Sequence, residues 1–177
     1  RTRIARETLE IYAPIAQRLG INEVRAELQD LGVMARYPLR YKIIAKHLAS
    51  QPVLRREAMA TLEARLAQRI AAENIPFRLV SRIKGPWSVY IKMRSEQKKF
   101  ADVMDVFGFR IVVKKTMQCY QVLGAVHSLM KPLEGRFRDF IAIPKANGYQ
   151  SLHTLLFSPL GSPVEVQIRT EEMDVVA

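Results

Sequence analysis

The sequence contains a single cysteine and lacks long apolar runs, glycine-rich phosphate loops and clusters of cysteine and histidine. The one thiol, Cys119, cannot form a disulfide within the chain, which fits a reducing compartment such as the cytosol. No apolar run approaches the ~18 residues that a membrane span requires, and the charged opening residues predict no secretory leader. Walker and Rossmann loops, zinc-ligand spacings and Gly-x-Ser-x-Gly are all missing. We therefore expect a cytoplasmic protein without a membrane partner.

The composition is that of a globular protein with a strong basic excess. The 177 residues suffice for one medium domain or two small ones, and 49% hydrophobic with 25% charged residues is ordinary. Lysine and arginine total 28 against 17 acidic residues, a net charge of +11. Residues 1–81 carry +6 and residues 82–177 carry +5, so the excess is not a detachable tail. An anionic partner is implied, either a phosphate ligand or a nucleic acid.

The first 75 residues carry helical patterns. Apolar residues at helical spacing from Ile4 to Leu19 predict a helix that is kinked or broken at Pro14 and stops at Gly20. Asn22 is expected to cap the next helix. The further helices are expected over residues 22–37, over 38–49 and from Pro52 onward, where Met59, Leu62, Leu66 and Ile70 line one face.

From Pro76 the pattern changes to strands that alternate with helices. The change from helical patterns to strand patterns near residues 72–76 marks a boundary between two parts of the chain rather than a flexible linker. We therefore expect an α+β protein in which an all-α segment precedes a sheet. Strands are expected at residues 77–83, 107–113, 138–143, 152–157 and 164–169. Helices are expected at 87–94, at 116–130 with Thr116 as its cap, and from Glu171.

The strand expected over residues 164–169 has one apolar and one polar face. Glu165, Gln167 and Arg169 share the polar face, which in an arbitrary strand is more often a solvated surface than a site. A second carboxylate, Asp105, stands just before another buried strand and weakens the solvated interpretation. Two carboxylates on neighbouring strands can hold Mg²⁺, which takes few protein oxygens and keeps several waters. Such an ion would offset phosphate charge in a phosphoryl transfer.

Basic and hydroxyl residues follow the first expected strand. Arg82 and Lys84 have the same parity, so their side chains leave the same face. A Gly-Pro step then leads into a helix that carries Ser88 and Lys92, and the free amides of a helix N-terminus bind phosphate. A solvated charged edge is nevertheless the commoner origin of an Arg-x-Lys pair. This signal is weak when taken alone.

The densest group of polar and aromatic residues lies between residues 140 and 154. It occupies nine residues between two apolar segments, which is more donor groups than a folded core requires. The composition is typical of a nucleotide site, in which an aromatic ring stacks on a base, an amide contacts the base edge and cations hold phosphates. The group consists of Lys145, Asn147, Tyr149, Gln150 and His153.

In order and spacing, five motifs resemble the synthetase domain of the RelA/SpoT family. The resemblance covers about residues 75–177. Residues 1–50 resemble the last helices of the family's hydrolase domain, which makes 51–75 a connecting helix and 76–177 the synthetase domain. The motifs are Arg82-Ile-Lys-Gly-Pro-Trp-Ser-Val-Tyr90, Asp105 to Arg110, Gly135 to Asp139, Pro144 to Thr154 and Glu165 to Thr170.

The resemblance implies a nucleotidyltransferase-like fold, a mixed sheet flanked by helices. It also implies transfer of the β,γ-pyrophosphate of ATP to the ribose 3′-hydroxyl of GDP or GTP, which makes the alarmone (p)ppGpp of the bacterial stringent response. Asp105 and Glu165 resemble the Mg²⁺ ligands, and Glu165 also resembles the base. The family's ATP contacts match Arg82, Lys84, Ser88 and Lys92. Its guanine-nucleotide contacts match Arg136, Arg138, Lys145, Asn147, the stacking residue Tyr149, and His153.

Three departures from the family pattern refine the expectation. The basic turn Arg136-Phe-Arg-Asp139 has arginine where bifunctional members usually have lysine, which keeps the charge but not the donor geometry, and we assign it to the bifunctional, SpoT-like type. The His-Asp metal site of the family's hydrolase is missing, so hydrolysis is not expected from these residues. The family's synthetase domain continues beyond the equivalent of Ala177, so this chain is expected to carry a truncated one.

Two other interpretations stay open. A non-catalytic guanine-nucleotide-binding module would keep Tyr149 and the cations without assembling the metal site. Binding of RNA through the basic surface would show a steep salt dependence and no preference for guanine mononucleotides, and it explains the Tyr149 motif poorly. We expect no specific nucleic-acid partner for these residues, whereas the intact protein is expected to contact regulatory partners.

Overall fold

The computed structural model describes residues 2–49, 52–97, 99, 103, 106–159 and 161–176. The chain forms two compact units, Arg1–Pro52 with Lys84–Val103 and Val53–Ile83 with Met104–Ala177, and each is described by itself. Within these described ranges, no helix is long and apolar enough to cross a membrane. The division into 1–50, 51–75 and 76–177 stays a prediction of the sequence.

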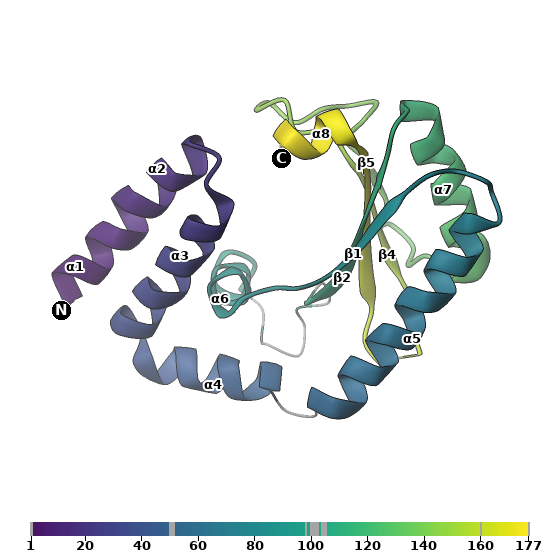
Figure 1. Cartoon of the computed structure of the whole chain (residues 1–177). Coiled ribbons are helices and arrows are strands. Elements are labelled where there is room, and N and C mark those ends of the chain that lie inside the picture. Colours follow the sequence, from purple (N-terminus) through teal and green to yellow (C-terminus); the bar gives the residue numbers. More distant parts are fainter. Residues whose placement is uncertain are drawn as a thin grey trace. The chain divides into compact units, whose positions relative to one another are not determined.

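The first unit is built from helices (Figure 1). Helix α3 packs against α1 and α2, and α6 packs against α3 and α4. This brings a helix from the middle of the chain onto helices from its beginning. The elements are α1 (Thr2–Glu7), η1 (Thr8–Tyr12), α2 (Ala13–Arg18), α3 (Asn22–Arg36), α4 (Pro38–Ala49) and α6 (Pro86–Ser95).

The disturbance predicted at Pro14 takes the form of a single wide helical turn. The segment Thr8–Tyr12 is a π-helix, in which the amide of Ala13 donates to the carbonyl of Thr8. Proline has no amide to donate, and a π-turn changes the hydrogen-bond register just before it without ending the helix. The predicted stop is confirmed, because Gly20 has a φ of +73° directly after α2.

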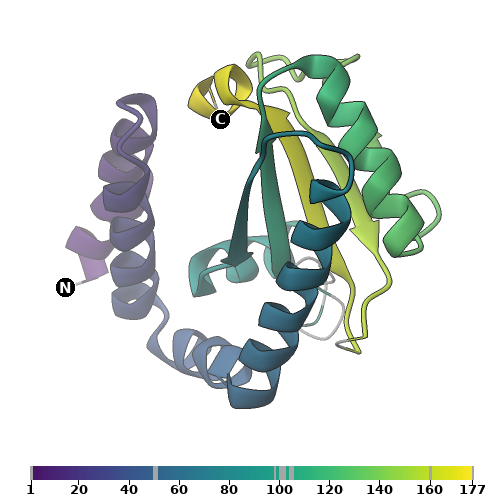
Figure 2. The same ribbon diagram turned by 45° about the vertical axis from the view of Figure 1, so that its right-hand side comes forward.

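The second unit contains a mixed sheet (Figures 1 and 2). Within the described residues it has five strands in the order β1-β2-β5-β4-β3. Strands β2 and β5 are parallel, and the other neighbours are antiparallel. The predicted α+β class with a mixed sheet and helices is therefore confirmed. The strands are β1 (Arg78–Ile83), β2 (Phe107–Val113), β3 (Arg138–Asp139), β4 (Leu152–Leu156) and β5 (Val164–Thr170).

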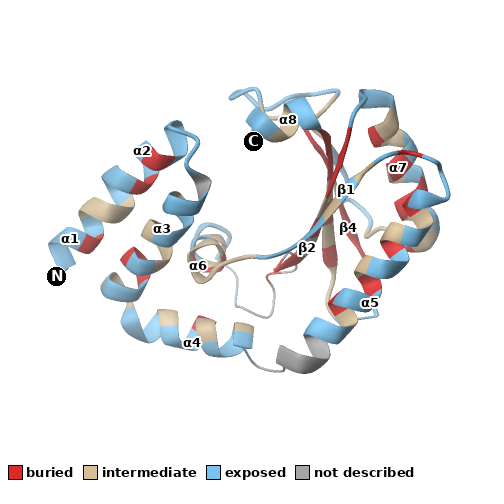
Figure 3. Ribbon diagram, in the orientation of Figure 1, coloured by how far each residue is buried: buried red, intermediate tan, exposed pale blue. Residues whose placement is uncertain are grey.

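Two helices, α5 (Pro52–Ala71) and α7 (Thr116–Leu129), cover one face of this sheet, and the short helix α8 (Glu171–Val176) follows β5 (Figure 2). The covered face is apolar at its centre, because residues of β2, β4 and β5 such as Phe109, Leu152 and Val166 are buried there, whereas β1 is exposed or half-buried along its length (Figure 3). Each fully buried aliphatic side chain contributes about 1.5–3 kcal/mol through the hydrophobic effect. The buried residues include Leu62, Leu66 and Ile70 of α5, Val122 and Val126 of α7, and Ile111, Val166 and Ile168 of the sheet.

Polar contacts fix these two helices in place. The Arg69 Nε of α5 donates to the Ser128 hydroxyl of α7 at 3.1 Å. In turn, the Nε2 of His127 lies 2.8 Å from the Thr154 hydroxyl of β4. Burial lowers the pKa of His127 below its usual value, so the neutral imidazole is favoured in the folded protein.

Three sequence predictions about element ends were wrong. The strand expected at 138–143 ends after Asp139, because the Asp139 carboxylate accepts the amides of Ile141 at 2.9 Å and Ala142 at 2.8 Å and turns the chain. Helix α3 begins at Asn22 itself, so its N-cap position is Ile21. Thr116 is likewise the first residue of α7, whose N-cap is Lys115.

Candidate active site

The face of the sheet opposite α5 and α7 is lined with polar side chains. Register places Glu165 beside Gly108 of β2, and Gln167 between Arg110 of β2 and His153 of β4. Directly paired residues project from the same face of a sheet. The alternation predicted for β5 is therefore confirmed, and four strands contribute to one polar surface. On the β1 side, Arg82 pairs with Gly108.

This surface is not the solvated outer face that an arbitrary strand would have. Arg169 is 1% exposed, and the side chains of His153 and Glu165 are 17% and 20% exposed. Guanidinium groups are almost never fully buried unless they are paired. The burial of Arg169 therefore indicates a built site.

A chain of contacts joins the polar side chains of β5 to the loop before β4. Arg169 Nη2 donates to Gln167 Oε1 at 2.6 Å, and Gln167 Nε2 donates to Glu165 Oε2 at 3.0 Å. The other carboxylate oxygen, Glu165 Oε1, lies 3.5 Å from His153 Nδ1. On the far side of the imidazole, Nε2 lies 2.7 Å from the Tyr149 hydroxyl. The orientation of Glu165 is thus linked to the position of Tyr149.

The ring of Tyr149 is half-buried and surrounded by aromatic and cationic groups. Phe140 and His153 meet it edge-on, with centroids at 6.2 Å and 5.7 Å. Lys145 Nζ lies 5.0 Å and Arg169 Cζ 5.4 Å from the ring centroid. Such cation–π contacts hold the ring and cations together. The structure therefore brings Lys145, Tyr149 and His153 together, whereas their contacts with a guanine nucleotide stay a prediction.

A tight turn presents Tyr149. The Gly148 amide donates to the Lys145 carbonyl at 2.8 Å, and Gly148 has a φ of +78°, a conformation that favours glycine. The side chain of Asn147 accepts the Tyr149 amide at 3.2 Å. Asn147 thus shapes the loop. Its predicted contact with a base edge stays a prediction.

Close approach of the two central strands depends on a glycine. A Cβ on Gly108 would lie 2.9 Å from the Glu165 carbonyl oxygen, which is closer than real Cβ atoms come to backbone. Gly108 thus lets β2 pass directly beside Glu165. The sequence contained this signal as a glycine inside a buried strand, where close backbone approach is the usual reason.

Sequence reasoning missed a cluster of arginines around Asp174 of α8. The Asp174 carboxylate lies 2.8 Å from Arg78, 3.4 Å from Arg110 and 3.6 Å from Arg169. Within the part of the chain that the structure describes, the buried Nε atoms of Arg110 and Arg169 and the Nη1 of Arg169 have no hydrogen-bond partner. Burial is the main cause that lowers the pKa of Arg169, and Arg110 and Arg82 lower it further.

One carboxylate thus faces three guanidinium groups, which leaves a local excess of positive charge with donors unused. Buried charges and buried donors are costly unless they are paired. Such a cluster favours an anion as a further partner. Arg78 and Asp174 are separated by 96 positions, so no local pattern in the sequence pairs them. The only signal was the acidic Asp174 itself, one helical turn beyond the polar strand.

The remaining predicted residues divide into three groups. Arg136 is exposed, and Arg138 donates to the carbonyls of Gly135 at 2.9 Å and Phe137 at 2.7 Å, so it stabilises its own turn. The grouping of Arg82 with the three residues of the first unit stays a prediction, and Asp105 lies outside the described residues. Those three residues are Lys84, Ser88 and Lys92.

Of the two residues predicted to bind Mg²⁺, only Glu165 lies within the described residues. Within the described ranges there is no group of three or more His, Cys, Asp or Glu side chains that could hold a metal. Mg²⁺ needs only one or two protein carboxylates when phosphates and waters complete its octahedron. The half-buried carboxylate of Glu165 fits that role, and the pair with Asp105 stays a prediction.

A cavity of about 440 Å³ lies beside the Tyr149 loop in the second unit. Ile141, Gly148 and Gln150 line one part of it, and Thr116 of α7 and Glu172 of α8 line another. The cavity therefore leaves room beside the loop that holds the aromatic ring.

Comparison with known proteins decides the family. The family described as "Region found in RelA / SpoT proteins" matches residues 81–177, more than half of the chain. The chain belongs to the RelA/SpoT family. The resemblance stated from five sequence motifs is therefore confirmed, and the matched residues include all of the polar sheet face except the first strand's beginning.

Relatives in the RelA/SpoT family match almost the whole chain. The bifunctional (p)ppGpp synthase/hydrolase SpoT of Escherichia coli K12 is 49% identical over 177 residues, which cover 100% of this chain and 25% of that protein. A GTP pyrophosphokinase of Streptomyces coelicolor is 44% identical over 169 residues, covering 96% of this chain and 20% of that protein. The chain thus spans about a quarter of the length of the curated relatives it matches.

Solved structures of other proteins share the fold. The small alarmone synthetase 2 of Bacillus subtilis has a TM-score of 0.59 at 26% identity, covering 69% of this chain and 71% of that one. The small alarmone synthetase 1 of the same species, bound to its product pppGpp, has a TM-score of 0.63 at 24% identity, covering 73% and 76%. These likenesses confirm the fold predicted from the resemblance.

Proposed function

We propose that the polar sheet face is the synthetase site of a (p)ppGpp-forming enzyme, a GTP/GDP pyrophosphokinase. The observation that carries the proposal is the continuous chain of contacts from buried Arg169 through Gln167 and Glu165 to His153 and Tyr149. It links a carboxylate that can accept a proton to an aromatic ring that can hold a base. The names of the relatives, a synthase/hydrolase and a GTP pyrophosphokinase, support the same chemistry.

In this proposal the ribose 3′-oxygen of GDP or GTP attacks the β-phosphorus of ATP. The new bond joins that oxygen to the β-phosphorus, the bond from the β-phosphorus to the α,β-bridging oxygen breaks, and AMP leaves with the electron pair. Glu165 accepts the proton of the 3′-hydroxyl. A positioned base of this kind contributes roughly 10²–10⁴-fold to the rate. Mg²⁺ held by Glu165 and Asp105 would offset the charge of the phosphates when it is bound.

The contacts of His153 define how Glu165 is held for this role. When the Tyr149 hydroxyl donates to Nε2 of His153, the imidazole proton lies on Nδ1 and faces Glu165 Oε1. Gln167 donates to the other oxygen, so the carboxylate is fixed at both ends. Holding a reacting group in one orientation lowers the barrier by removing motions that would otherwise be frozen during reaction.

The guanine base is proposed to stack on Tyr149. Stacking of a base on an aromatic side chain contributes roughly 1–3 kcal/mol. Lys145, whose ammonium lies over the same ring, is placed to contact a phosphate of that nucleotide. The excess positive charge around Arg110 and Arg169 attracts phosphates to this face. The ATP contacts Arg82, Lys84, Ser88 and Lys92 come from the family resemblance.

One observation favours a non-catalytic guanine-nucleotide-binding module as the second candidate. Both oxygens of Glu165 already contact protein groups, Gln167 and His153, which suits a structural carboxylate. In that case the site binds GDP or GTP but does not assemble the metal centre. Several relatives are named pyrophosphohydrolases. We propose that hydrolysis belongs to other parts of the intact protein.

Calorimetric titration of ATP with and without Mg²⁺ separates the two candidates. For the synthetase, Mg²⁺ tightens ATP binding in the unchanged protein but not in Asp105→Ala or Glu165→Ala. Glu171 is an exposed carboxylate at the start of α8, so Glu171→Ala is the matched control. In this control Mg²⁺ should still tighten ATP binding. An equal response to Mg²⁺ in all variants would favour the non-catalytic module.

A further inference from the structure

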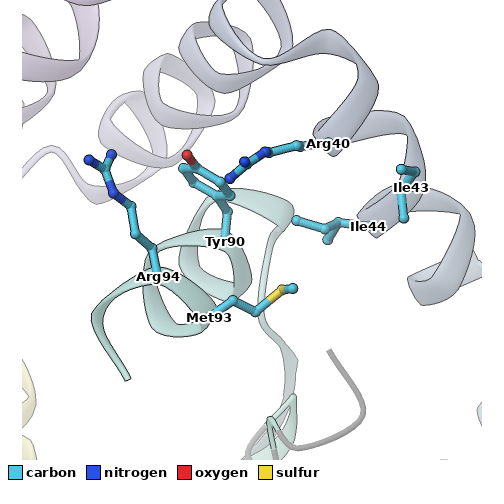
Figure 4. A pocket seen from close by; sticks show the side chains of 6 residues that line it. All are labelled: Arg40, Ile43, Ile44, Tyr90, Met93 and Arg94. Carbon is cyan, nitrogen blue, oxygen red and sulfur yellow. The ribbon is translucent and has the colours of Figure 1, made fainter. Parts of the chain in front are cut away.

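The first unit contains a cavity that none of the predicted nucleotide contacts lines. Its volume is about 310 Å³, and it lies between α4 and α6 (Figure 4). Ile43 and Ile44 of α4 and Met93 of α6 form its apolar wall, whereas Arg40 of α4 and Tyr90 and Arg94 of α6 bring polar groups to it. The cavity therefore has both an apolar and a cationic part.

The polar groups gather at one side of this cavity. In Figure 4 the guanidinium groups of Arg40 and Arg94 and the hydroxyl of Tyr90 lie at the same end, and Ile44 and Met93 lie away from them. Ile44 is 4% exposed and Tyr90 is 5% exposed, so the floor of the cavity belongs to the core of the unit. An occupant would thus meet cationic and hydroxyl groups at one end of the cavity and apolar groups at the other.

The positive charge at the polar end of the cavity is not neutralised by ion pairs among the residues that the structure describes. Neither Arg40 nor Arg94 forms an ion pair with a carboxylate of the described residues, and the same holds for Arg36 at the end of α3. These arginines contact aromatic rings instead. Arg40 Cζ lies 5.7 Å from the centroid of Tyr90, and Arg36 Cζ lies 5.5 Å from the centroid of Tyr37.

The positive charge also affects the pKa of the neighbouring Tyr37. The Tyr37 ring packs on Tyr90 with centroids 5.1 Å apart. Burial alone would raise the pKa of Tyr37, but its interactions with Arg36, with the Tyr90 hydroxyl and with Arg94 outweigh burial and lower the pKa. The lowered pKa reflects the positive charge of Arg36 and Arg94 beside the Tyr37 hydroxyl.

We propose that this cavity is a second ligand site, which binds an amphipathic anion: a phosphate or carboxylate group attached to an apolar body. The anion lies on Arg40 and Arg94, and the apolar body fills the space beside Ile44 and Met93. Arginine is suited to this task, because its planar fork of donors pairs with phosphate and carboxylate oxygens in two-point contacts. The site does not depend on the proposed synthetase reaction.

A series of alkyl phosphates tests the site directly. We expect calorimetric affinity to rise from ethyl to butyl to hexyl phosphate by about fourfold per added methylene, until the cavity is filled. Inorganic phosphate, which lacks the apolar body, and hexanol, which lacks the charge, should both bind much more weakly than hexyl phosphate. Equal affinity for inorganic and hexyl phosphate would overturn the proposal, because it would mean that only surface charge is involved.

Fluorescence of the protein's sole tryptophan locates the binding event. Trp87 lies in α6 with its ring centroid 6.1 Å from Tyr90, and alkyl phosphates do not absorb in the same range. Hexyl phosphate should change the Trp87 emission with the affinity found by calorimetry. Binding measured by calorimetry with no change in emission would place the ligand elsewhere and contradict the proposed location.

Variants of the two exposed arginines complete the test. Arg40→Gln and Arg94→Gln should each weaken hexyl phosphate binding by about tenfold or more, the usual effect of removing a hydrogen bond to a charged group. Arg18→Gln, an exposed arginine of α2 in the same unit, is the matched control and should leave the affinity unchanged. Equal weakening in all three would show a general effect of net charge and would refute the site. Unchanged binding of GDP in Arg40→Gln would separate this site from the proposed synthetase site.

Discussion

The two faces of the sheet in the second unit differ in what burial achieves. Between one face and the helices α5 and α7, buried residues such as Leu66 of α5 and Ile168 of β5 gain stability by leaving water. On the opposite face, Arg169 is just as buried, yet its guanidinium keeps donors without partners. Burial of charge costs free energy. One alternating strand, β5, thus supplies a stabilising face and a face prepared for charged ligands.

The largest expected effect comes from a substitution on the polar face that lowers activity without lowering stability. Glu165→Gln keeps the shape of the side chain but removes the charge and the proton acceptor, so the rate of (p)ppGpp formation should fall by roughly 10²–10⁴-fold. The midpoint of urea unfolding should hardly change. Initial rates and unfolding curves of Glu165→Gln and of the control Glu171→Gln measure both quantities. An unaltered rate in Glu165→Gln would remove this carboxylate from the mechanism.

A substitution on the apolar side should do the opposite and lower stability without weakening GDP binding. Leu66 is fully buried in α5, and Leu66→Ala should lower the free energy of unfolding by about 2–5 kcal/mol, through lost burial and a new cavity. Below the unfolding transition, the affinity for GDP should stay within about twofold, which is less than 1 kcal/mol. Urea unfolding and calorimetry provide the two numbers. A large loss of GDP affinity in the folded variant would mean that the two faces are not independent.

A smaller effect separates the ring of Tyr149 from its hydroxyl. Tyr149→Ala should weaken GDP binding by roughly 5–150-fold, since stacking contributes roughly 1–3 kcal/mol. Tyr149→Phe keeps the ring but breaks the contact with His153, so GDP affinity should be retained while the rate falls by about tenfold, as expected for one lost hydrogen bond. If Tyr149→Phe matched the unchanged protein in both GDP affinity, measured by calorimetry, and reaction rate, the hydroxyl would have no role in orienting Glu165.

The smallest expected effect is the pH dependence of folding stability that arises from His127, on the apolar side of the sheet. The folded protein lowers the pKa of His127 from its usual 6.5, because burial disfavours the imidazolium. The unfolded chain therefore takes up the proton more readily, and the stability that the neutral ring contributes is lost as pH falls below about 6.5. His127→Gln should make urea stability between pH 7.5 and 5.5 less pH-dependent. An identical pH dependence in both proteins would show that other groups determine it.

Local signals in the sequence were enough to predict much of the fold. The alternation of Val164 to Arg169 correctly predicted both faces of β5, and proline and glycine correctly marked the starts of α4 and α5 and the end of α2. The extent of β3 was wrong, because the carboxylate of Asp139 turns the chain where side-chain alternation alone favoured a strand.

Contacts between distant positions were beyond reach of the sequence. Arg78 and Asp174 meet across 96 positions, and no local pattern pairs them. The link between Tyr149 and Glu165 depends on the register of β4 with β5, which places His153 beside Gln167. The residue pattern and the family resemblance both pointed to Tyr149, His153 and Glu165, and the structure adds how these three contact one another. The predicted partnership of Asp105 with Glu165 stays a prediction.

The most direct test of the account follows the products formed from labelled ATP with GDP and Mg²⁺, separated by chromatography. It is run on this chain and on a longer form of the protein that contains it. We expect AMP and ppGpp in equal amounts, with both lost in Glu165→Gln. If ATP and GDP bind but neither form yields ppGpp, the polar face of the sheet is a nucleotide-binding surface and not a site of pyrophosphate transfer.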